Sequence, residues 1–185
     1  MLAKHAMPVV NPHVPPRCWR LSEEGRHQSI TLAERLEGYG LEFIVTSEEP
    51  KAAETGEIAS ERLGIGWAVA SGLHEHDRTG AAFGTKEEFE SSARNFFENP
   101  ERLVWGNETA EHAQARFASG VHAVLKEYPK ENLAVVAHGT VNTLFLMQYN
   151  DIDAYGFWSR LGLPSFYALS LPDFELRDVT CDVSA

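Results

Sequence analysis

The run Leu133-Ala134-Val135-Val136-Ala137-His138-Gly139-Thr140 decides the fold class of this chain. Its first five residues are apolar and include two adjacent valines, which is typical of a strand buried on both faces of a sheet. Residues 141–147 follow, most of them apolar, and predict a buried helix. A strand that passes directly into a helix, with a histidine at the junction, indicates a layered α/β protein with polar groups at a strand end.

Strands and helices alternate on either side of this unit. The further predicted strands are residues 1–5, 43–46, 67–70, 166–171 and 177–181. Helices are predicted after the capping signals at Ser22, Thr46 and Thr85, and over residues 108–128. This alternation predicts an α/β fold of three layers, with a mainly parallel central sheet and helices on both faces.

The chain is strongly acidic. Among its 185 residues, 16 Lys and Arg stand against 27 Asp and Glu, which gives a formal net charge of −11. This charge disfavours binding to nucleic acid and to anionic membrane surfaces. An anionic small ligand therefore needs a local basic pocket.

The cysteines and the apolar runs bear on where the protein works. Cys18 and Cys181 lie far apart and in no metal or redox spacing, so they fit a reducing compartment. No apolar run approaches the roughly 20 residues of a membrane helix. The first residues reach Pro8 too soon for a signal-peptide core. We expect a cytoplasmic protein.

Polar side chains with complementary chemistry follow three of the predicted strands. His5 ends the first strand, Glu75 follows the third, and His138 ends the apolar strand described above. Lys4 stands beside a strand end, and Lys51 stands in the first turn of a helix. Ligands of α/β proteins bind beyond the carboxyl ends of the strands. These groups are therefore candidates for a site that binds a phosphate and attacks it.

Six short motifs occur in order between the first residues and about Met147. They read Lys4-His5-Ala6, Leu21-Ser22-Glu23-Glu24-Gly25-Arg26-His27-Gln28, Ser47-Glu48-Glu49-Pro50-Lys51-Ala52-Ala53-Glu54-Thr55, Leu73-His74-Glu75, Asn107-Glu108-Thr109 and Val136-Ala137-His138-Gly139. With these motifs the chain resembles the histidine phosphatase superfamily, the phosphoglycerate mutase-like family. The resemblance implies the α/β architecture already predicted, as a single domain over residues 1–185 with a small cap from about 72–107.

The resemblance also implies a role for each strand-end residue. His5 is expected to be the nucleophile that forms a phosphohistidine, and His138 to donate a hydrogen bond to the phosphoryl oxygens. Glu75 is expected to protonate the leaving alcohol and then to act as the base toward water. Lys4 and Lys51 occupy positions where the family has phosphate-binding arginines. No metal or other cofactor is implied.

The expected function is that of a phosphatase, which hydrolyses a small phosphorylated substrate, a phosphomonoester, through phospho-His5. Lysine offers phosphate a strongly hydrated point charge in place of the planar fork of arginine. Because of the two lysines, a second function stays open. The protein could be a catalytically weak relative that binds a phosphorylated ligand or has a regulatory role. Phosphoglycerate mutase-type transfer is also open, although residues 72–107 are short for the larger mutase cap. The sequence predicts no oligomeric state.

Several neighbouring residues have two interpretations. Glu87 and Glu88 could replace Glu75 as the acid if a cap helix carries them to the pocket. The loop cations that either bind substrate or are solvated are Arg17, Arg20 and Arg78. The aromatic side chains that form either the core face of a helix or an apolar lid are Phe89, Phe96 and Phe97.

A metal site is a competing hypothesis. The string His74-Glu75-His76-Asp77 invites comparison with the His-x-His-x-Asp-His motif of metallo-β-lactamase-like hydrolases. In this chain the aspartate follows the second histidine directly and no histidine comes next, so the spacing does not match. The sequence therefore favours chemistry without a metal.

Overall fold

A computed structural model describes residues 1–81 and 84–183; residues 82 and 83, which belong to the predicted cap, and residues 184 and 185 lie outside the described residues. The described chain contains a six-stranded sheet with the strand order β3-β2-β4-β1-β5-β6. The strands are β1 (Leu2–Lys4), β2 (Phe43–Ser47), β3 (Gly66–Ala70), β4 (Leu133–Ala137), β5 (Ser165–Leu169) and β6 (Leu176–Thr180).

Four neighbouring strands of this sheet run parallel. β3, β2, β4 and β1 pair in parallel, whereas β5 is antiparallel to β1 and β6 is antiparallel to β5. The prediction of a mainly parallel sheet is confirmed, and every predicted strand is present. β5 ends at Leu169 and not at residue 171, because the chain turns there and the Ser170 N–H bonds to the Glu175 carbonyl at 3.0 Å.

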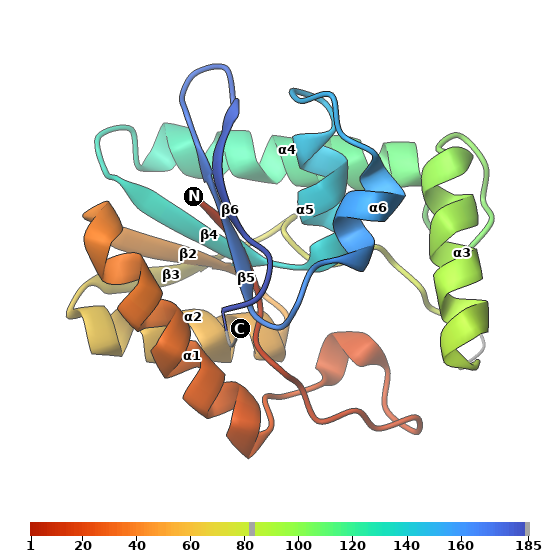
Figure 1. Ribbon diagram of the computed structural model, residues 1–185, viewed down its shortest axis with the longest axis horizontal. Helices are drawn as coiled ribbons and strands as arrows, with labels where there is room; N and C mark the ends of the chain where they lie inside the picture. The colour runs from red at the N-terminus through yellow and green to blue at the C-terminus, as the bar shows by residue number, and fades with distance from the viewer. Residues whose placement is uncertain (82–83, 184–185) are drawn as a thin grey trace.

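Helices cover both faces of the sheet, as predicted. The helices are α1 (Glu23–Leu36), α2 (Pro50–Leu63), α3 (Lys86–Glu98), α4 (Ala110–Glu127), α5 (Gly139–Leu146) and α6 (Ala154–Ser159), with short 3-10 turns η1 (Pro16–Cys18) and η2 (Glu37–Tyr39). In Figure 1, α1 and α2 lie on one side of the sheet and α4 and α5 on the other, while α3 stands apart at the edge of the molecule.

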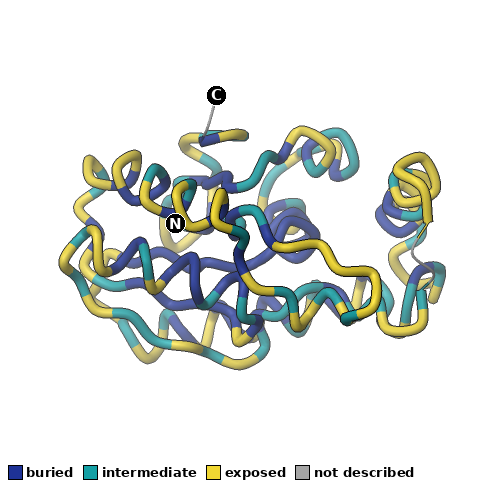
Figure 2. The backbone as a smooth tube through the Cα atoms, turned by 90° about the horizontal axis from the view of Figure 1, so that it is seen from below, coloured by how far each residue is buried: buried dark blue, intermediate teal, exposed yellow. Residues whose placement is uncertain are grey.

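The two faces of the sheet belong to two separate apolar cores. Leu2 and Val45 pack into the core that contains α4 and α5, whereas their chain neighbours Ala3 and Ile44 pack into the core under α1 and α2. Successive side chains of a strand point to opposite faces, so a strand buried on both sides must be apolar throughout. The inner strands β1, β2 and β4 accordingly lie in the buried centre of the tube in Figure 2, whereas β3 and β6 contain no buried residue.

The helix starts follow local capping chemistry in two of three predicted places. The Ser22 side chain accepts an N–H of the first turn of α1 at 3.0 Å, and Thr85 forms a capping box with Glu88 at the start of α3. The third prediction is wrong. Thr46 lies within β2, and α2 begins at Pro50, whose fixed φ suits the first helical position. Two residues thus connect β2 to α2 at the carboxyl edge of the sheet.

Helix α6 has no counterpart among the predicted elements. It has six residues, three of them aromatic, and no side chain caps its start. A short segment of this kind carries no helix signal in the sequence. Burial of Phe157 in the core with α4 and α5 stabilises α6 in the folded chain.

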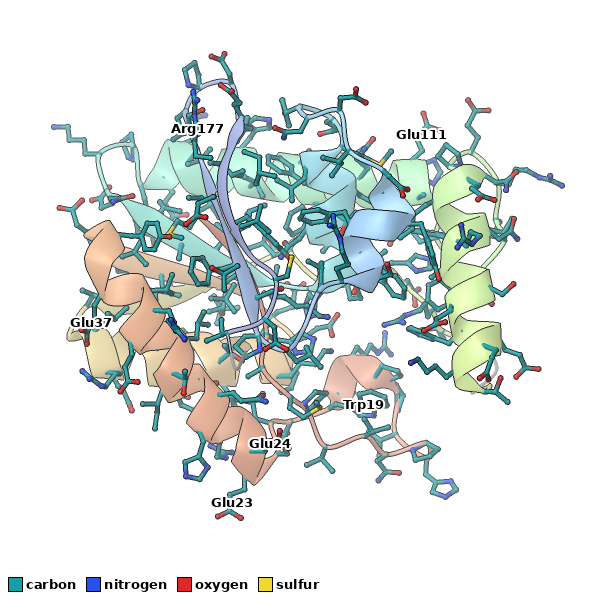
Figure 3. The ribbon with its side chains drawn as sticks, in the orientation of Figure 1. Trp19, Glu23, Glu24, Glu37, Glu111 and Arg177 are labelled. Carbon is teal, nitrogen blue, oxygen red and sulfur yellow. The ribbon has the colours of Figure 1, made fainter. Side chains whose placement is uncertain are left out.

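The outer surface carries the negative charge. Glu23 and Glu24 on α1, Glu37 on η2 and Glu111 on α4 are exposed, and Glu23 and Glu111 point away from the body of the protein (Figure 3). Among residues 1–81 and 84–183, no helix is both long and apolar enough to cross a bilayer. An anionic ligand of this surface depends on local cations.

Candidate active site

The two strand-end histidines lie side by side. His5 follows β1, and His138 follows β4, which is the parallel neighbour of β1 in the sheet. Their ring centroids are 5.2 Å apart, and both side chains are buried. The sheet order therefore brings two imidazoles together at its carboxyl edge.

The His5 ring is held in one tautomer. Its Nδ1 lies 2.7 Å from the Ala6 carbonyl, and a carbonyl only accepts, so Nδ1 carries the proton. The Ala6 N–H in turn donates to Thr55 Oγ1 on α2 at 3.1 Å, which fixes this turn of the chain. Burial, and then the electrostatic coupling to the His138 ring and the charge of Lys51, hold the pKa of His5 well below its usual value. His5 is therefore neutral, with an unprotonated Nε2.

His138 is neutral for the same reasons. Burial and the nearby Lys51 charge hold the pKa of His138 well below its usual value. Its Nε2 lies 2.9 Å from Ser47 Oγ at the end of β2. Among the described residues, Nδ1 of His138 has no hydrogen-bond partner although it is buried. A buried ring nitrogen without a partner is available to a ligand or a water molecule.

Lys4 lies along the start of α5. A Cβ on Gly139 would stand 3.2 Å from Lys4 Cε, so the glycine makes room for the lysine chain. The ammonium group donates to the Leu161 carbonyl at 2.9 Å. Burial lowers the pKa of Lys4 to about 8, although the charges of Glu75 and Asp182 oppose the shift.

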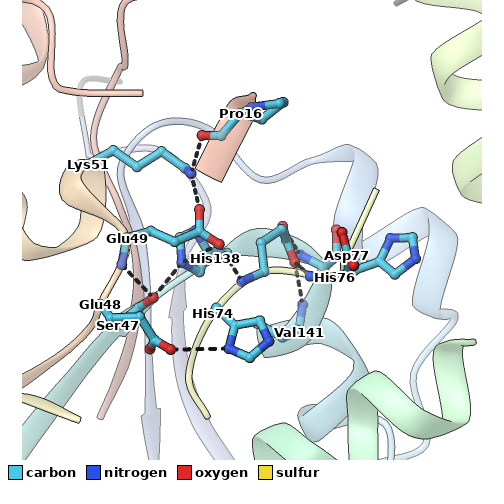
Figure 4. Close-up of polar contacts among 12 residues, drawn as sticks. Pro16, Ser47, Glu48, Glu49, Lys51, His74, His76, Asp77, His138 and Val141 are labelled. Atoms are coloured by element: carbon cyan, nitrogen blue, oxygen red, sulfur yellow. Dashed lines mark hydrogen bonds and ion pairs between the residues drawn. The ribbon is translucent and has the colours of Figure 1, made fainter. Parts of the chain in front are cut away.

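Lys51 forms a buried ion pair with Glu49, a residue that the sequence analysis did not single out. Lys51 Nζ donates to a Glu49 carboxylate oxygen and, at 2.9 Å, to the Pro16 carbonyl (Figure 4). The other Glu49 oxygen accepts the Glu75 N–H at 2.9 Å and lies 3.8 Å from His138 Nε2. Glu49 is the second residue after β2, and this position near the strand end is the signal that could have identified it.

The Glu75 carboxylate binds the first amides of α5. It accepts N–H groups of Thr140 and Val141 at 3.2 Å each, and that of His76 at 2.9 Å. Burial raises the pKa of Glu75, but the electrostatic coupling to the His138 ring, the charge of Arg78 and the His76 N–H together outweigh burial, so that the pKa is lowered overall. Glu75 is therefore a carboxylate at neutral pH.

A second ion pair supports the loop that carries Glu75. Arg116 on α4 donates through two nitrogens to the Glu108 carboxylate, at 2.8 Å each. The same guanidinium donates to the carbonyls of Gly72 at 3.0 Å, His74 at 2.9 Å and Glu75 at 3.3 Å. The motif that contains Glu108 thus positions the loop after β3 instead of contacting the two histidines.

Arg78 is the loop cation with the clearest relation to the site. Its guanidinium lies 4.9 Å from the centroid of Trp105 and 5.5 Å from that of Phe89, and its charge lowers the pKa of Lys4 and of Glu75. Across residues 1–81 and 84–183 it has no hydrogen-bond acceptor. Arg20, by contrast, pairs with Glu54 at 2.6 Å, and Arg17 is exposed.

In the described part of the chain, the remaining candidate acids and metal ligands form no hydrogen bond or ion pair with His5 or His138. Glu87 and Glu88 are exposed at the start of α3, where Glu88 serves the capping box. His74 Nδ1 faces Glu48 at 3.3 Å, whereas His76 Nε2 bonds to a backbone carbonyl at 3.0 Å. In the described part of the chain, no three His, Cys, Asp or Glu side chains are placed to hold a metal ion.

The aromatic residues of α3 were expected to form either the core face of a helix or an apolar lid, and they differ in burial. Phe96 and Phe97 are buried in the core, whereas Phe89 is 39% exposed and packs against Trp105 and Trp158. Phe96 and Phe97 are thus core residues, and Phe89 is left at the surface beside Arg78.

The sheet order and the paired strand-end histidines define a protein of the phosphoglycerate mutase-like fold. The sequence model for the histidine phosphatase superfamily (branch 1) matches residues 17–176, and the chain belongs to this superfamily. The Lys4-His5-Ala6 motif precedes the matched residues. No curated protein sequence matches the chain significantly.

Solved structures show the same fold at low sequence identity. Bacillus stearothermophilus YhfR has a TM-score of 0.72 at 22% identity, over 98% of this chain and 96% of its own. Mycobacterial glucosyl-3-phosphoglycerate phosphatase with inorganic phosphate has 0.70 at 19%, over 100% and 97%. A phosphoserine phosphatase mutant from Entamoeba histolytica, in complex with phosphoserine, has 0.69 at 13%, over 96% and 94%.

Proposed function

We propose that this protein is a phosphatase that hydrolyses a phosphomonoester through a phosphohistidine on His5. The observation that carries the proposal is the state of the His5 ring, which is buried and neutral, with Nδ1–H bonded to the Ala6 carbonyl. An imidazole in this tautomer has a lone pair on Nε2 for attack on phosphorus. His138, Lys4 and Lys51 surround it with groups suited to phosphoryl oxygens.

In the first step, His5 Nε2 forms a bond to phosphorus while the bond from phosphorus to the ester oxygen breaks. The electron pair of that bond leaves with the alcohol oxygen, which takes a proton from Glu75. A bound phosphate dianion raises the pKa of a neighbouring carboxyl, since it disfavours a second negative charge nearby. Glu75 thus takes up its proton when substrate binds.

In the second step, water attacks the phosphorus of phospho-His5. Glu75, again a carboxylate, accepts the proton of the attacking water, and the bond from phosphorus to Nε2 breaks to release inorganic phosphate. Glu75 can act as this base because it has given its proton to the alcohol in the first step.

The segment 72–107 is proposed as the cap over this site. It carries Arg78 and the aromatic side chains of Phe89 and Trp105 that face it. A half-buried guanidinium without a hydrogen-bond acceptor among the described residues is suited to an anionic or polar group on the leaving-group side of the substrate.

A second candidate is a protein that binds a phosphorylated ligand with little turnover. The observation that favours it is the Lys51–Glu49 pair, because a cation already paired with a carboxylate is a weaker phosphate ligand. One assay separates the two roles.

The test is turnover of p-nitrophenyl phosphate and of a set of phosphorylated metabolites, with His5→Ala as the matched control. We expect phosphate release by the wild type and a loss of about 10³-fold or more in kcat for His5→Ala. Acid quenching of the wild type during turnover should destroy the phosphoryl group, and alkaline quenching should preserve it on the peptide that contains His5.

Full activity of His5→Ala rejects the proposal. Binding of phosphorylated ligands without turnover by the wild type selects the second candidate. Interconversion of phosphoglycerates faster than their hydrolysis would indicate a mutase instead.

A further inference from the structure

Glu49 places a buried negative charge where the proposed function requires a phosphate. Its side chain is 7% exposed, and it lies in the connection between β2 and α2. Glu49 is the N-cap residue of α2, but its side chain makes no capping hydrogen bond to the helix. Another reason is therefore needed for a carboxylate at this position.

The contacts of Glu49 join three of the proposed site residues. One carboxylate oxygen pairs with Lys51, and the other accepts the Glu75 N–H at 2.9 Å and lies 3.8 Å from His138 Nε2 (Figure 4). Glu49 is thus inside the polar cluster and not at its rim.

This arrangement limits what Lys51 offers to a ligand. Of its three N–H groups, one donates to Glu49 and one to the Pro16 carbonyl at 2.9 Å, which leaves one. A phosphate bound at Lys51 would also stand close to the Glu49 charge. In a site of low dielectric such a like-charge contact is strongly unfavourable.

Glu54 on α2 is a second buried carboxylate, and its partners differ from those of Glu49. It is also buried, but it pairs with Arg20 at 2.6 Å and Arg26 at 2.9 Å, whose side chains are 70% and 50% exposed. Glu54 thus ties surface arginines to the helix, and its partners lie outside the proposed site.

We propose that Glu49 is a specificity-determining residue that competes with phosphate for Lys51. Phosphate binds only when Glu49 turns away from Lys51, and the cost of this change weakens the binding of phosphate alone. Inorganic phosphate is then a weak ligand that leaves readily. Substrates whose leaving group makes contacts of its own are favoured over small phosphate esters. This inference rests on the proposed function, since it assigns the phosphate to the same site.

The test measures the dissociation constant of inorganic phosphate by titration calorimetry for the wild type, Glu49→Gln and Glu54→Gln. We expect the dissociation constant of phosphate to be lower by about tenfold or more in Glu49→Gln, because one charge-assisted contact becomes available to phosphate. KM for p-nitrophenyl phosphate should fall by a similar factor. Glu54→Gln removes the same charge from a nearby buried position and should not tighten binding.

Unchanged or weaker phosphate binding in folded Glu49→Gln overturns the inference, as does an equal gain in Glu54→Gln. A crystal structure of the wild type with phosphate is a second test that does not depend on a variant. The Glu49 carboxylate should be out of contact with Lys51, and phosphate bound beside an intact pair overturns the inference.

These outcomes are separable from failure of the proposed function. Phosphate binding requires no turnover, so a gain in Glu49→Gln stands even if His5 is never phosphorylated. Conversely, a wild type that turns over through His5, combined with no gain in Glu49→Gln, rejects the role of Glu49 alone.

Discussion

Cations are held differently in the two parts of the candidate site. At the strand ends, Lys4 donates to the Leu161 carbonyl, while Lys51 donates to the Pro16 carbonyl and to Glu49. On the cap side, Arg78 faces two aromatic rings and has no hydrogen-bond acceptor in the described part of the chain. Both strand-end lysines are therefore hydrogen-bonded to protein groups, whereas the Arg78 guanidinium has no acceptor among the described residues.

This difference separates two contributions to ligand binding. In the proposed function, the residues at the strand ends contribute neutral imidazoles and a carboxylate to the chemical steps. Arg78 contributes a cation for the rest of the ligand. The following measurements test this division.

The largest effect is expected for Glu75→Gln. Loss of the proposed acid and base should lower kcat on alkyl phosphates by about 10²-fold or more, and less on p-nitrophenyl phosphate, whose leaving group needs little protonation. Glu87→Gln, at an exposed position of α3, is the matched control and should be unaffected. Equal losses on both substrates would remove Glu75 from the acid role.

The second effect concerns stability at acidic pH. His5 and His138 have lowered pKa values in the folded protein, so the unfolded chain binds more protons just below pH 6.5. The free energy of unfolding should therefore have its full value above pH 6.5 and decrease below it, by up to about 1.4 kcal/mol per pH unit for each histidine. Denaturant unfolding at pH 7, 6 and 5 measures this slope.

His138→Gln is the variant that checks the assignment. It removes one of the two groups. The slope of the free energy of unfolding against pH, between pH 6.5 and 5, should therefore decrease by the equivalent of up to one bound proton per molecule. An identical slope in the variant and the wild type would show that other groups cause the acid sensitivity.

The third effect is on the alkaline limb of activity. The pKa of Lys4 is about 8 in the ligand-free protein, so kcat/KM should fall as the pH rises through 8 and Lys4 loses its charge. Arginine stays protonated over this range, and Lys4→Arg should move the fall to higher pH. Lys126→Arg, at an exposed position of α4, should not move it. If the alkaline fall of kcat/KM stays at the same pH in Lys4→Arg, the fall is not due to the titration of Lys4.

The smallest effect is expected on the cap side. Arg78→Met should raise KM for an anionic substrate several-fold, by roughly the free energy of one partly solvated charged hydrogen bond, with little change in kcat. The control is Arg94→Met, since Arg94 also lies over an aromatic ring, at 3.9 Å from the centroid of Tyr155. Equal effects of the two variants would mean that Arg78 serves the packing of the cap.

The predicted helix start at Thr46 was wrong because this residue is part of the central sheet. Thr46 has a capping-box pattern, but its position in β2 buries it between parallel neighbours. Pro50 then starts α2, and Glu49 is left in the loop that becomes part of the candidate site. The local pattern was the weaker determinant because burial of β2 in both cores stabilises it as a strand.

The sequence by itself determined the strands, the mainly parallel sheet and the two histidines at its carboxyl edge. Apolar runs identify buried strands, and parallel strands necessarily end at one edge, so His5 and His138 are brought together by topology. Only the tertiary structure decided that Lys51 pairs with Glu49, and that Arg78 lies over Trp105 without an acceptor among the described residues. Those contacts depend on the directions of side chains in loops, which are set by packing between elements far apart in the sequence and not by local periodicity.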